Sequence, residues 1–375
     1  MIQNIETHKI EKRTSDNAQS NSQTTAQKYQ VGIIGCGLIG NKRANALKQF
    51  PNSKLIIVAD TNLTRAQTLA TQYGCEATSD WQKVTQNPAI NIVIIATTHD
   101  MLEPIILDAI KHNKHILVEK PAGRNPQELA RLVDAAKKQP AIKIKVGYNH
   151  RNHPAFQKAK EIIATENIGD IMYIRGKYGH GARVGYDKEW RAIKEISGGG
   201  EVIDQGSHMI DLARYFMGDF NSAIGCCKTF FWDMEVEDNG FVILSTKDGK
   251  IAQFNVSCTQ WKNVFQFEIY CRTGQISIDG LGGSYGTETL TFYKMKPEMG
   301  PPDKTVFSWE SDNSWAKDYE LLLSAIESKN QSIQPEGNIF DAYESMKLVY
   351  QLYDWSEKQY GKPNLKLPLP KKDQK

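Results

Sequence analysis

Acidic side chains and a histidine in the middle of the chain have the types and spacing that proton transfer requires. Asp204, His208 and Asp211 follow the glycine run 198–200, and a helix over this segment would place all three on one face. The four-residue spacing then lets Asp204 orient or polarise the His208 imidazole. Taken alone, the pattern also fits a solvated polar face or a histidine held in a core. No third ligand lies at a spacing suited to a metal ion, so no metal site is expected.

A lysine in the first half of the chain adds a positive charge to this candidate site. Lys120 lies in the run Glu119-Lys120-Pro121, directly after the apolar segment 115–118. Proline restricts the residue before it to extended conformations, which fixes where the Lys120 ammonium group points. The alternative is a surface lysine at the end of a strand, because lysine is mostly exposed in proteins.

The segment 29–60 reads as a strand, a glycine turn, a helix and a second strand. The turn, Gly35-Cys36-Gly37-Leu38-Ile39-Gly40, has the spacing of a dinucleotide-binding fingerprint. Gly35 permits the tight turn, Gly37 lets a pyrophosphate approach the backbone, and Gly40 lets the helix pack against the strand. The helix N-terminus then offers unpaired N–H groups to the phosphates. A glycine-rich turn in another kind of α/β protein is the alternative.

Asp60 lies twenty residues after Gly40, at the end of the second strand. Its carboxylate would accept hydrogen bonds from an adenosine ribose and would repel a 2′-phosphate. The expected cofactor is therefore NAD, with NADP less favoured. Cys36, inside the turn, is interpreted as a small filler, because no neighbouring residue suggests thiol chemistry.

The elements that position these residues alternate between strand and helix up to about residue 150. Strands are expected at 31–34, 54–59, 92–96, 115–119 and 142–147, with helices at about 40–49 and 63–73, near Trp81, up to about 112 and from Asn125 onward. Repeated βα units predict a parallel, doubly wound sheet of the Rossmann type. Ligands bind such sheets beyond the carboxyl ends of the strands, where the glycine turn, Thr97, His99, Glu119 and Lys120 would converge.

The chain changes character after residue 150. A helix to about residue 165 is followed by apolar runs at 171–178, 223–231, 240–246, 251–258, 264–272, 275–279 and 288–293, and by helices at 315–328 and 340–358. Consecutive strands without crossover helices predict an open, mainly antiparallel sheet in a second α/β domain. The expected division is a disordered tail at 1–28, an NAD-binding domain at 29–150, a substrate and oligomerisation domain at 151–360 and a tail at 361–375.

Composition narrows the class of protein. The 375 residues are too many for one ordinary core, and a formal net charge of +3 gives no reason to expect nucleic acid. The sequence shows neither a membrane-spanning apolar run nor the apolar core of a signal peptide, so a cytoplasmic protein without membrane contact is expected. Its 6 cysteines are scattered without a CxxC pair, which indicates reduced thiols rather than a disulfide framework.

Together, these stretches resemble the Gfo/Idh/MocA oxidoreductase family over about residues 29–360. The matching motifs are the fingerprint 35–40, the run 119–121 and the segment 198–208, in the family's order and spacing. By this resemblance, the second domain is an α/β domain whose open sheet covers the cofactor and commonly makes subunit contacts. A homodimer or homotetramer is therefore expected.

The resemblance also implies that Lys120, Asp204 and His208 form the catalytic set of a sugar dehydrogenase. Oxidising a secondary alcohol requires removal of the hydroxyl proton while hydride moves to the nicotinamide. His208 is then the expected base, Lys120 the cation that stabilises the alkoxide, and Asp204 the group that orients His208. This assignment replaces the two structural alternatives given above for these residues.

A cationic, aromatic segment before the catalytic helix bears on the substrate. Residues 175–194 hold six basic side chains, Arg183 and Arg191 among them, against two acidic ones. Aromatic side chains, Trp190 among them, are interleaved with these charges. Such a wall would suit an anionic sugar, either a nucleotide-activated sugar or a uronate, although a solvated loop fits equally well. Trp190-Arg191 resembles a pair that family members carry before the glycines. Tyr148 and Arg151 would border the same cleft.

Two other functions fit the same resemblance. One is an enzyme that uses tightly held NAD transiently, as in the family's sugar–sugar oxidoreductases or its NAD-dependent glycosidases. The other is a non-catalytic regulator that binds NAD and senses sugars. The joint presence of Lys120, Asp204 and His208 argues against the regulator, because a sensor has no evident need for the full set.

Overall fold

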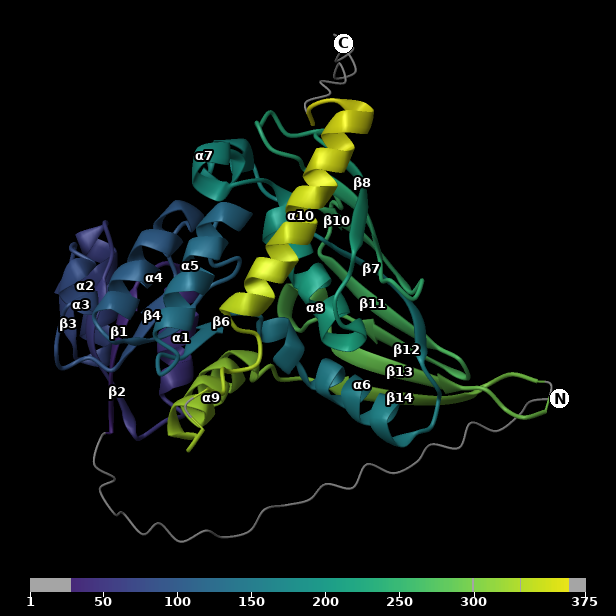
Figure 1. The fold of residues 1–375 in the computed structure, drawn as a ribbon, viewed down its shortest axis with the longest axis horizontal. Coiled ribbons are helices and arrows are strands. Elements are labelled where there is room, and N and C mark those ends of the chain that lie inside the picture. Colours follow the sequence, from purple (N-terminus) through teal and green to yellow (C-terminus); the bar gives the residue numbers. More distant parts are fainter. Residues whose placement is uncertain (1–27, 299, 331, 364–375) are drawn as a thin grey trace, which may run out of the picture.

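The computed structural model describes residues 28–298, 300–330 and 332–363. Two sheets are joined by helices, and the long helix α10 (Ile339–Tyr360) runs diagonally between them (Figure 1). The predicted tails at 1–28 and 361–375 lie almost entirely outside the described residues. Among those residues, no helix is long and apolar enough to cross a membrane.

The first sheet has six strands in the order β3-β2-β1-β4-β5-β6, and all of its neighbouring pairs are parallel. This confirms the predicted doubly wound, Rossmann-type sheet. Helices cover both faces, so a central strand such as β4 is buried along its whole length. The strands are β1 (Tyr29–Ile34), β2 (Ser53–Ala59), β3 (Glu76–Thr78), β4 (Ile92–Ile95), β5 (His115–Val118) and β6 (Ile144–Val146), and the helices are α1 (Leu38–Leu47), α2 (Leu63–Tyr73), α3 (Gln82–Thr85), α4 (Leu102–Lys111) and α5 (Pro126–Lys138).

The second sheet has eight strands in the order β14-β13-β12-β11-β7-β10-β9-β8. The predicted open and mainly antiparallel sheet is confirmed, with one exception: β7 and β10 pair in parallel. They do so because the chain crosses one face of the sheet through α8 before it returns to the strands. The strands are β7 (Ile171–Gly179), β8 (Ser222–Lys228), β9 (Asn239–Ser245), β10 (Ile251–Ser257), β11 (Val264–Cys271), β12 (Gly274–Asp279), β13 (Glu288–Lys294) and β14 (Asp303–Trp309).

The remaining helices join the two sheets. α8 (Ser207–Met217) follows a π-helical turn, η5 (Val202–Gly206), and α9 (Ser314–Glu327) packs against the first sheet. The apolar side chains Tyr319 and Leu322 of α9 share a core cluster with Val31 of β1. α9 therefore covers the NAD-binding sheet, although it falls within the predicted second domain. The shorter elements are η1 (His99–Met101), η2 (Asn149–Asn152), α6 (Pro154–Thr165), η3 (Tyr186–Lys188), η4 (Trp190–Ala192), α7 (Lys194–Ser197) and η6 (Gly283–Tyr285).

Candidate active site

The glycine turn has the geometry that its spacing predicts. Gly35 has φ +96°, and a Cβ built there would lie 2.2 Å from the carbonyl oxygen of Ala96. A Cβ on Gly40 would lie 1.9 Å from the carbonyl oxygen of Gly35, so the helix and the strand meet backbone to backbone. A Cβ on Gly37 would meet no atom within 4 Å. The backbone at Gly37 is therefore open to a ligand at the N-terminus of α1.

Asp60 lies beside this turn. One carboxylate oxygen accepts the backbone N–H of Cys36 at 2.8 Å, and the other accepts that of Asn62 at 2.8 Å. These bonds fix the carboxylate at the rim of the turn, where each oxygen keeps a further lone pair. Cys36 is buried, and burial raises the pKa of its thiol to about 12, which fits a filler rather than a reactive thiol.

Lys120 and Asp204 meet at the carboxyl end of β5. The Lys120 ammonium donates to the backbone oxygen of Asp204 at 2.6 Å and also contacts its carboxylate. The other carboxylate oxygen of Asp204 accepts a bond from Arg191 Nε at 3.1 Å. Burial opposes ionisation of Asp204, but the two cations outweigh it and hold its pKa well below the usual range. Asp204 is therefore an anion that anchors Lys120.

His208 lies deeper than the two charged groups, with 5% of its surface exposed. Burial, with the charge of Lys120, holds its pKa well below the usual value, so the imidazole is neutral. The negative charge of Asp204 raises the pKa of His208. The carboxylate oxygens of Asp204 contact Lys120 and Arg191. The prediction that Asp204 orients His208 assumed α-helical spacing, whereas Asp204 lies in the π-helical turn η5.

Three further predicted cofactor residues lie at the same edge of the sheet. Thr97 follows β4, and its hydroxyl donates to the neighbouring backbone. His99 bonds through Nδ1 to the backbone oxygen of Ser197 at 2.8 Å, and burial, followed by the charge of Lys120, lowers its pKa to about 4. Glu119 accepts a hydrogen bond from the buried Arg43 at 2.7 Å. Its carboxylate therefore has a partner inside the protein, and we do not expect it to bind the cofactor directly.

The residues predicted to bind substrate separate into two groups. Tyr148 and Arg151 are buried, with exposed fractions of 1% and 5%, and Arg151 forms a two-pronged ion pair with Asp211 at 2.7 and 2.6 Å. The predicted border role of Arg151 therefore conflicts with its burial, because its charge is already satisfied inside the protein. Its partner Asp211 was predicted to share a face with His208.

Arg183, Trp190 and Arg191 lie beside the glycine turn, and Arg191 also reaches Asp204. They line a cleft of about 630 Å³ together with Gly37. Arg183 pairs with Glu189 at 2.8 Å. The remaining lining residues are Cys36, Leu38, Asn41, Arg65, Thr68, Leu69 and Glu189. The cationic segment therefore faces the predicted dinucleotide turn.

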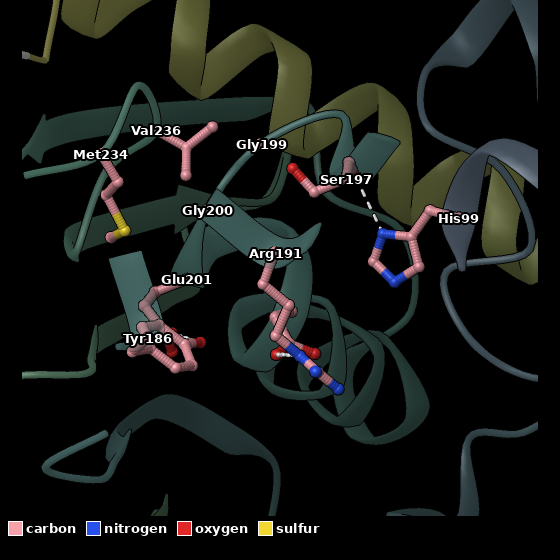
Figure 2. Close-up of a pocket in the computed structure, with 10 residues that line it drawn as sticks. His99, Tyr186, Arg191, Ser197, Gly199, Gly200, Glu201, Met234 and Val236 are labelled. Carbon is pink, nitrogen blue, oxygen red and sulfur yellow. Dashed lines mark hydrogen bonds and ion pairs between the residues drawn. The ribbon is translucent and has the colours of Figure 1, made fainter. Parts of the chain in front are cut away.

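A small cavity is lined by Asp204, Arg191 and Glu201. Figure 2 shows Arg191 with His99 on one side and Glu201 with Tyr186 on the other. The cavity measures about 10 Å³, which is room for about one water molecule. Tyr186 donates to one Glu201 oxygen at 2.9 Å, and burial raises the pKa of Glu201 to about 8, with a further contribution from Asp204.

Sequence reasoning missed four residues of this region. Arg65 lines the cleft from α2, Glu201 follows the glycine run, and His150 stacks on His208. Arg43 is buried under the sheet edge and bonds to Glu119. Only His150 had a usable signal, since it follows the last strand of the first sheet. Among the described residues, no group of three or more His, Cys, Asp or Glu side chains could hold a metal ion.

The chain is similar to known sugar and polyol dehydrogenases. It is 31% identical over 234 residues to a levoglucosan dehydrogenase of Pseudarthrobacter phenanthrenivorans, a match that covers 60% of each chain. It is 25% identical over 321 residues to an inositol 2-dehydrogenase of Rhizobium meliloti, covering 82% of this chain and 92% of that one. A solved levoglucosan dehydrogenase, in complex with NADH and L-sorbose, has the same fold, with TM-score 0.80 and 22% identity over 88% of this chain and 97% of that one.

Two family descriptions match the two sheets separately. Residues 29–148, which carry the glycine turn and Lys120, match the oxidoreductase family with an NAD-binding Rossmann fold. Residues 156–277, which carry Asp204 and His208, match the GFO/IDH/MocA C-terminal domain. Both halves of the candidate site thus fall inside the matched ranges, and the protein belongs to the Gfo/Idh/MocA family of oxidoreductases, with the NAD-binding domain of that family.

Proposed function

We propose that the protein is an NAD-dependent dehydrogenase that oxidises a secondary hydroxyl group of a sugar or cyclic polyol. The observation that carries the proposal is the contact between Lys120 and ionised Asp204, beside a neutral and buried His208. A cation and a neutral base at the edge of a nucleotide-binding sheet are the two groups that alcohol oxidation needs.

The residues around the glycine turn fit NAD. The open backbone at Gly37 and the N-terminus of α1, which has no side-chain cap, suit a pyrophosphate. Arg65 and Arg183 add positive charge on the two walls of the cleft. Asp60 keeps lone pairs for a ribose at the rim of the turn. When bound there, NAD supplies the acceptor for the hydride.

The protein groups handle the proton and the charge on oxygen. His208 takes the hydroxyl proton, because its lowered pKa keeps the imidazole neutral and its lone pair available at neutral pH. Lys120 donates a hydrogen bond to the substrate oxygen as negative charge develops there. Asp204 holds the ammonium group in place through its carboxylate and its backbone oxygen.

We further propose an uncharged substrate ring. The anionic sugar predicted from the sequence depends on Arg151, Arg183 and Arg191, and each of these already pairs with a carboxylate. Arg183 and Arg191 also face the glycine turn, where a dinucleotide diphosphate is the expected anion. The relatives named levoglucosan dehydrogenase and inositol 2-dehydrogenase support a neutral sugar or polyol.

The first experiment follows the absorbance of reduced nicotinamide. Purified protein is given NAD with anhydrosugars, inositols and free sugars in one set, and with uronates and nucleotide-activated sugars in another. A rise in the first set alone is expected. A rise only in the second set would restore the anionic prediction. No rise in either set, with NAD retained through purification, would support the alternative of tightly held cofactor.

The variant His208→Asn tests the base. It should bind NAD with unchanged affinity, because His208 lies outside the cleft that the glycine turn lines, and it should lose turnover by about 100-fold to 10,000-fold. Binding is measured by isothermal titration calorimetry and turnover with the substrate found in the panel. Turnover within twofold of wild type would show that another residue is the base.

A further inference from the structure

His208 has a second histidine as its direct neighbour. Its ring stacks on that of His150, with 3.8 Å between ring centroids and 25° between ring planes. His150 comes from η2, just after the last strand of the first sheet, and 6% of it is exposed. The stack therefore joins the two sheets at the candidate base, and the mechanism above assigns no role to His150.

Asn149 fixes which nitrogen of His150 carries the proton. The Asn149 amide donates through Nδ2 to Ser314 Oγ at 2.9 Å, and its Oδ1 lies 3.2 Å from Nδ1 of His150. An amide oxygen only accepts hydrogen bonds, so Nδ1 of the neutral ring carries the proton. Nε2 of His150 then holds a lone pair. Within the described residues this atom is buried and has no hydrogen-bond partner.

His208 also has a ring nitrogen without a hydrogen-bond partner in the described part of the chain. This nitrogen, Nδ1, is buried. For Nε2 of His208 to take the substrate proton, Nδ1 must carry the proton of the neutral ring. A donor that lacks an acceptor therefore lies in one ring, and an acceptor that lacks a donor lies in the ring stacked on it. Buried polar groups of this kind rarely stay unpaired in a native protein.

The charges around the pair disfavour a second proton on either ring. Burial lowers the pKa of both histidines well below the usual value, and the charge of Lys120 lowers both further. Asp204 opposes this effect at His208 alone. His153, whose ring centroid lies 5.6 Å from that of His150, bonds to the buried Glu288 at 2.8 Å. The uncharged hydroxyl-bearing rings that face the pair are Tyr148 and Tyr178.

We propose that His150 is a positioning residue for the base, an inference that rests on the proposed function of His208. When substrate binds, the two rings tilt out of the stack, and Nδ1–H of His208 donates to Nε2 of His150. This bond directs Nε2 of His208 at the substrate hydroxyl. In the step itself the O–H bond breaks and an Nε2–H bond forms, while the carbon–oxygen double bond forms as hydride leaves for NAD. The bond to His150 stabilises the resulting imidazolium.

Two substitutions of His150 separate positioning from packing. Phenylalanine keeps a planar ring without an acceptor, whereas glutamine keeps an acceptor oxygen. His150→Phe should lower kcat about tenfold to 100-fold, with NAD affinity unchanged. In the His150→Phe variant, the pKa of His208 should fall, because its imidazolium loses the hydrogen-bond acceptor. The acid limb of the pH profile of kcat/KM should therefore move to lower pH. His150→Gln should recover most of kcat, and His112→Phe, directly after α4, is the matched control.

The inference is overturned if His150→Phe keeps the kcat and pH profile of the wild type, because His150 then serves packing alone. A second measurement needs no folded variant: ¹⁵N spectra of histidine-labelled wild-type protein report which nitrogen is protonated. The expected spectrum shows His150 protonated at Nδ1, and protonation at Nε2 overturns the inference. Full turnover in His208→Asn would instead contradict the proposed function, whichever nitrogen of His150 carries the proton.

Discussion

Two carboxyl groups less than one helical turn apart, Asp204 partly buried and Glu201 buried, differ in charge because their neighbours differ. Asp204 contacts Lys120 and Arg191, and its pKa is held well below the usual range. Glu201 has a tyrosine hydroxyl as its bonded partner, and burial raises its pKa to about 8. Opposite shifts in one site commonly separate groups with different tasks. We interpret Asp204 as the fixed anion and Glu201 as a neutral group at neutral pH.

Replacing Lys120 by methionine tests the charge on oxygen. The variant keeps the length of the side chain but removes the donor, so kcat should fall by about 100-fold to 1,000-fold, while KM changes much less. Asp204→Asn should give a smaller loss, because the amide still accepts a bond from the ammonium group. Steady-state kinetics on both variants check this order. Equal losses would show that Asp204 has a task beyond holding Lys120.

Glu201→Gln tests the raised pKa through stability. A carboxyl group whose pKa rises on folding costs no stability below its unfolded pKa of 4.5, and the cost grows as pH rises to about 8. The wild type should therefore lose stability across this window by on the order of a few kcal/mol relative to the variant. Urea unfolding of both proteins at pH 5 and pH 8 measures the difference. Parallel pH dependence would show that Glu201 is ionised when folded.

At the level of elements, the glycine turn joins β1 to α1, and its glycines serve different purposes. Gly37 leaves room for a ligand, whereas Gly40 lets the helix pack against the strand. Gly37→Ala adds a methyl group that meets no protein atom within 4 Å. It should leave the thermal midpoint unchanged and weaken NAD binding at least tenfold, because the methyl group occupies the approach of the pyrophosphate. Gly40→Ala places its Cβ 1.9 Å from the Gly35 oxygen and should destabilise the fold by about 1–3 kcal/mol.

Calorimetric melting and NAD titration distinguish the two glycine variants. The expected pattern is a binding loss without a stability loss for Gly37→Ala, and a stability loss for Gly40→Ala. A Gly37→Ala protein that binds NAD as the wild type does would contradict the role of this turn.

The elements that the sequence predicted are those marked by a clear apolar run or by a helix-capping residue. The parallel sheet follows from short buried runs such as Ile92–Ile95, and the start of α5 follows from Asn125, whose side chain caps the helix as expected. β14 was missed because it is an edge strand with mostly exposed side chains. The π-helical turn η5 was not predicted, and its Asp204 pairs with Lys120 of the first domain, a contact that the local sequence does not reveal.

At the level of the whole molecule, ion pairs between distant segments fix how the helices close the first sheet. Arg43 of α1 is 1% exposed and pairs with both Glu119 and Asp318 of α9. Lys145 of β6 pairs with the same Asp318 at 2.9 Å. None of these charges has a partner nearby in the sequence, so the sequence could give neither their burial nor the position of α9. The same limit applies to Arg151, which looked like a cleft residue.

The outer face of the second sheet carries the last prediction, which concerns the assembly. The inner side chains Val242 and Leu244 of β9 are buried, whereas Phe241 and Ile243 on the opposite face are 45% and 38% exposed. Tyr173 and Ile251, which are in register on β7 and β10, are also exposed on the face of Ile243. This face also carries polar side chains such as Gln253 and Arg175, and a mixed face with exposed aromatic and aliphatic groups suits a symmetric pairing with a second copy of the chain. We predict a homodimer through this face, and a homotetramer would require a further surface.

Sedimentation of the double variant Phe241→Lys, Ile243→Lys checks the dimer. Two like charges on each copy would face their counterparts across a two-fold axis, so the variant should sediment as a monomer and keep its NAD affinity, because both positions lie on the second sheet. Trp355→Lys on α10, a residue 41% exposed, should leave the wild-type mass unchanged. A monomeric wild type would refute the assembly itself. A double variant that stays dimeric would move the contact to another surface, because two facing pairs of buried lysines would repel each other across the two-fold axis and separate the copies.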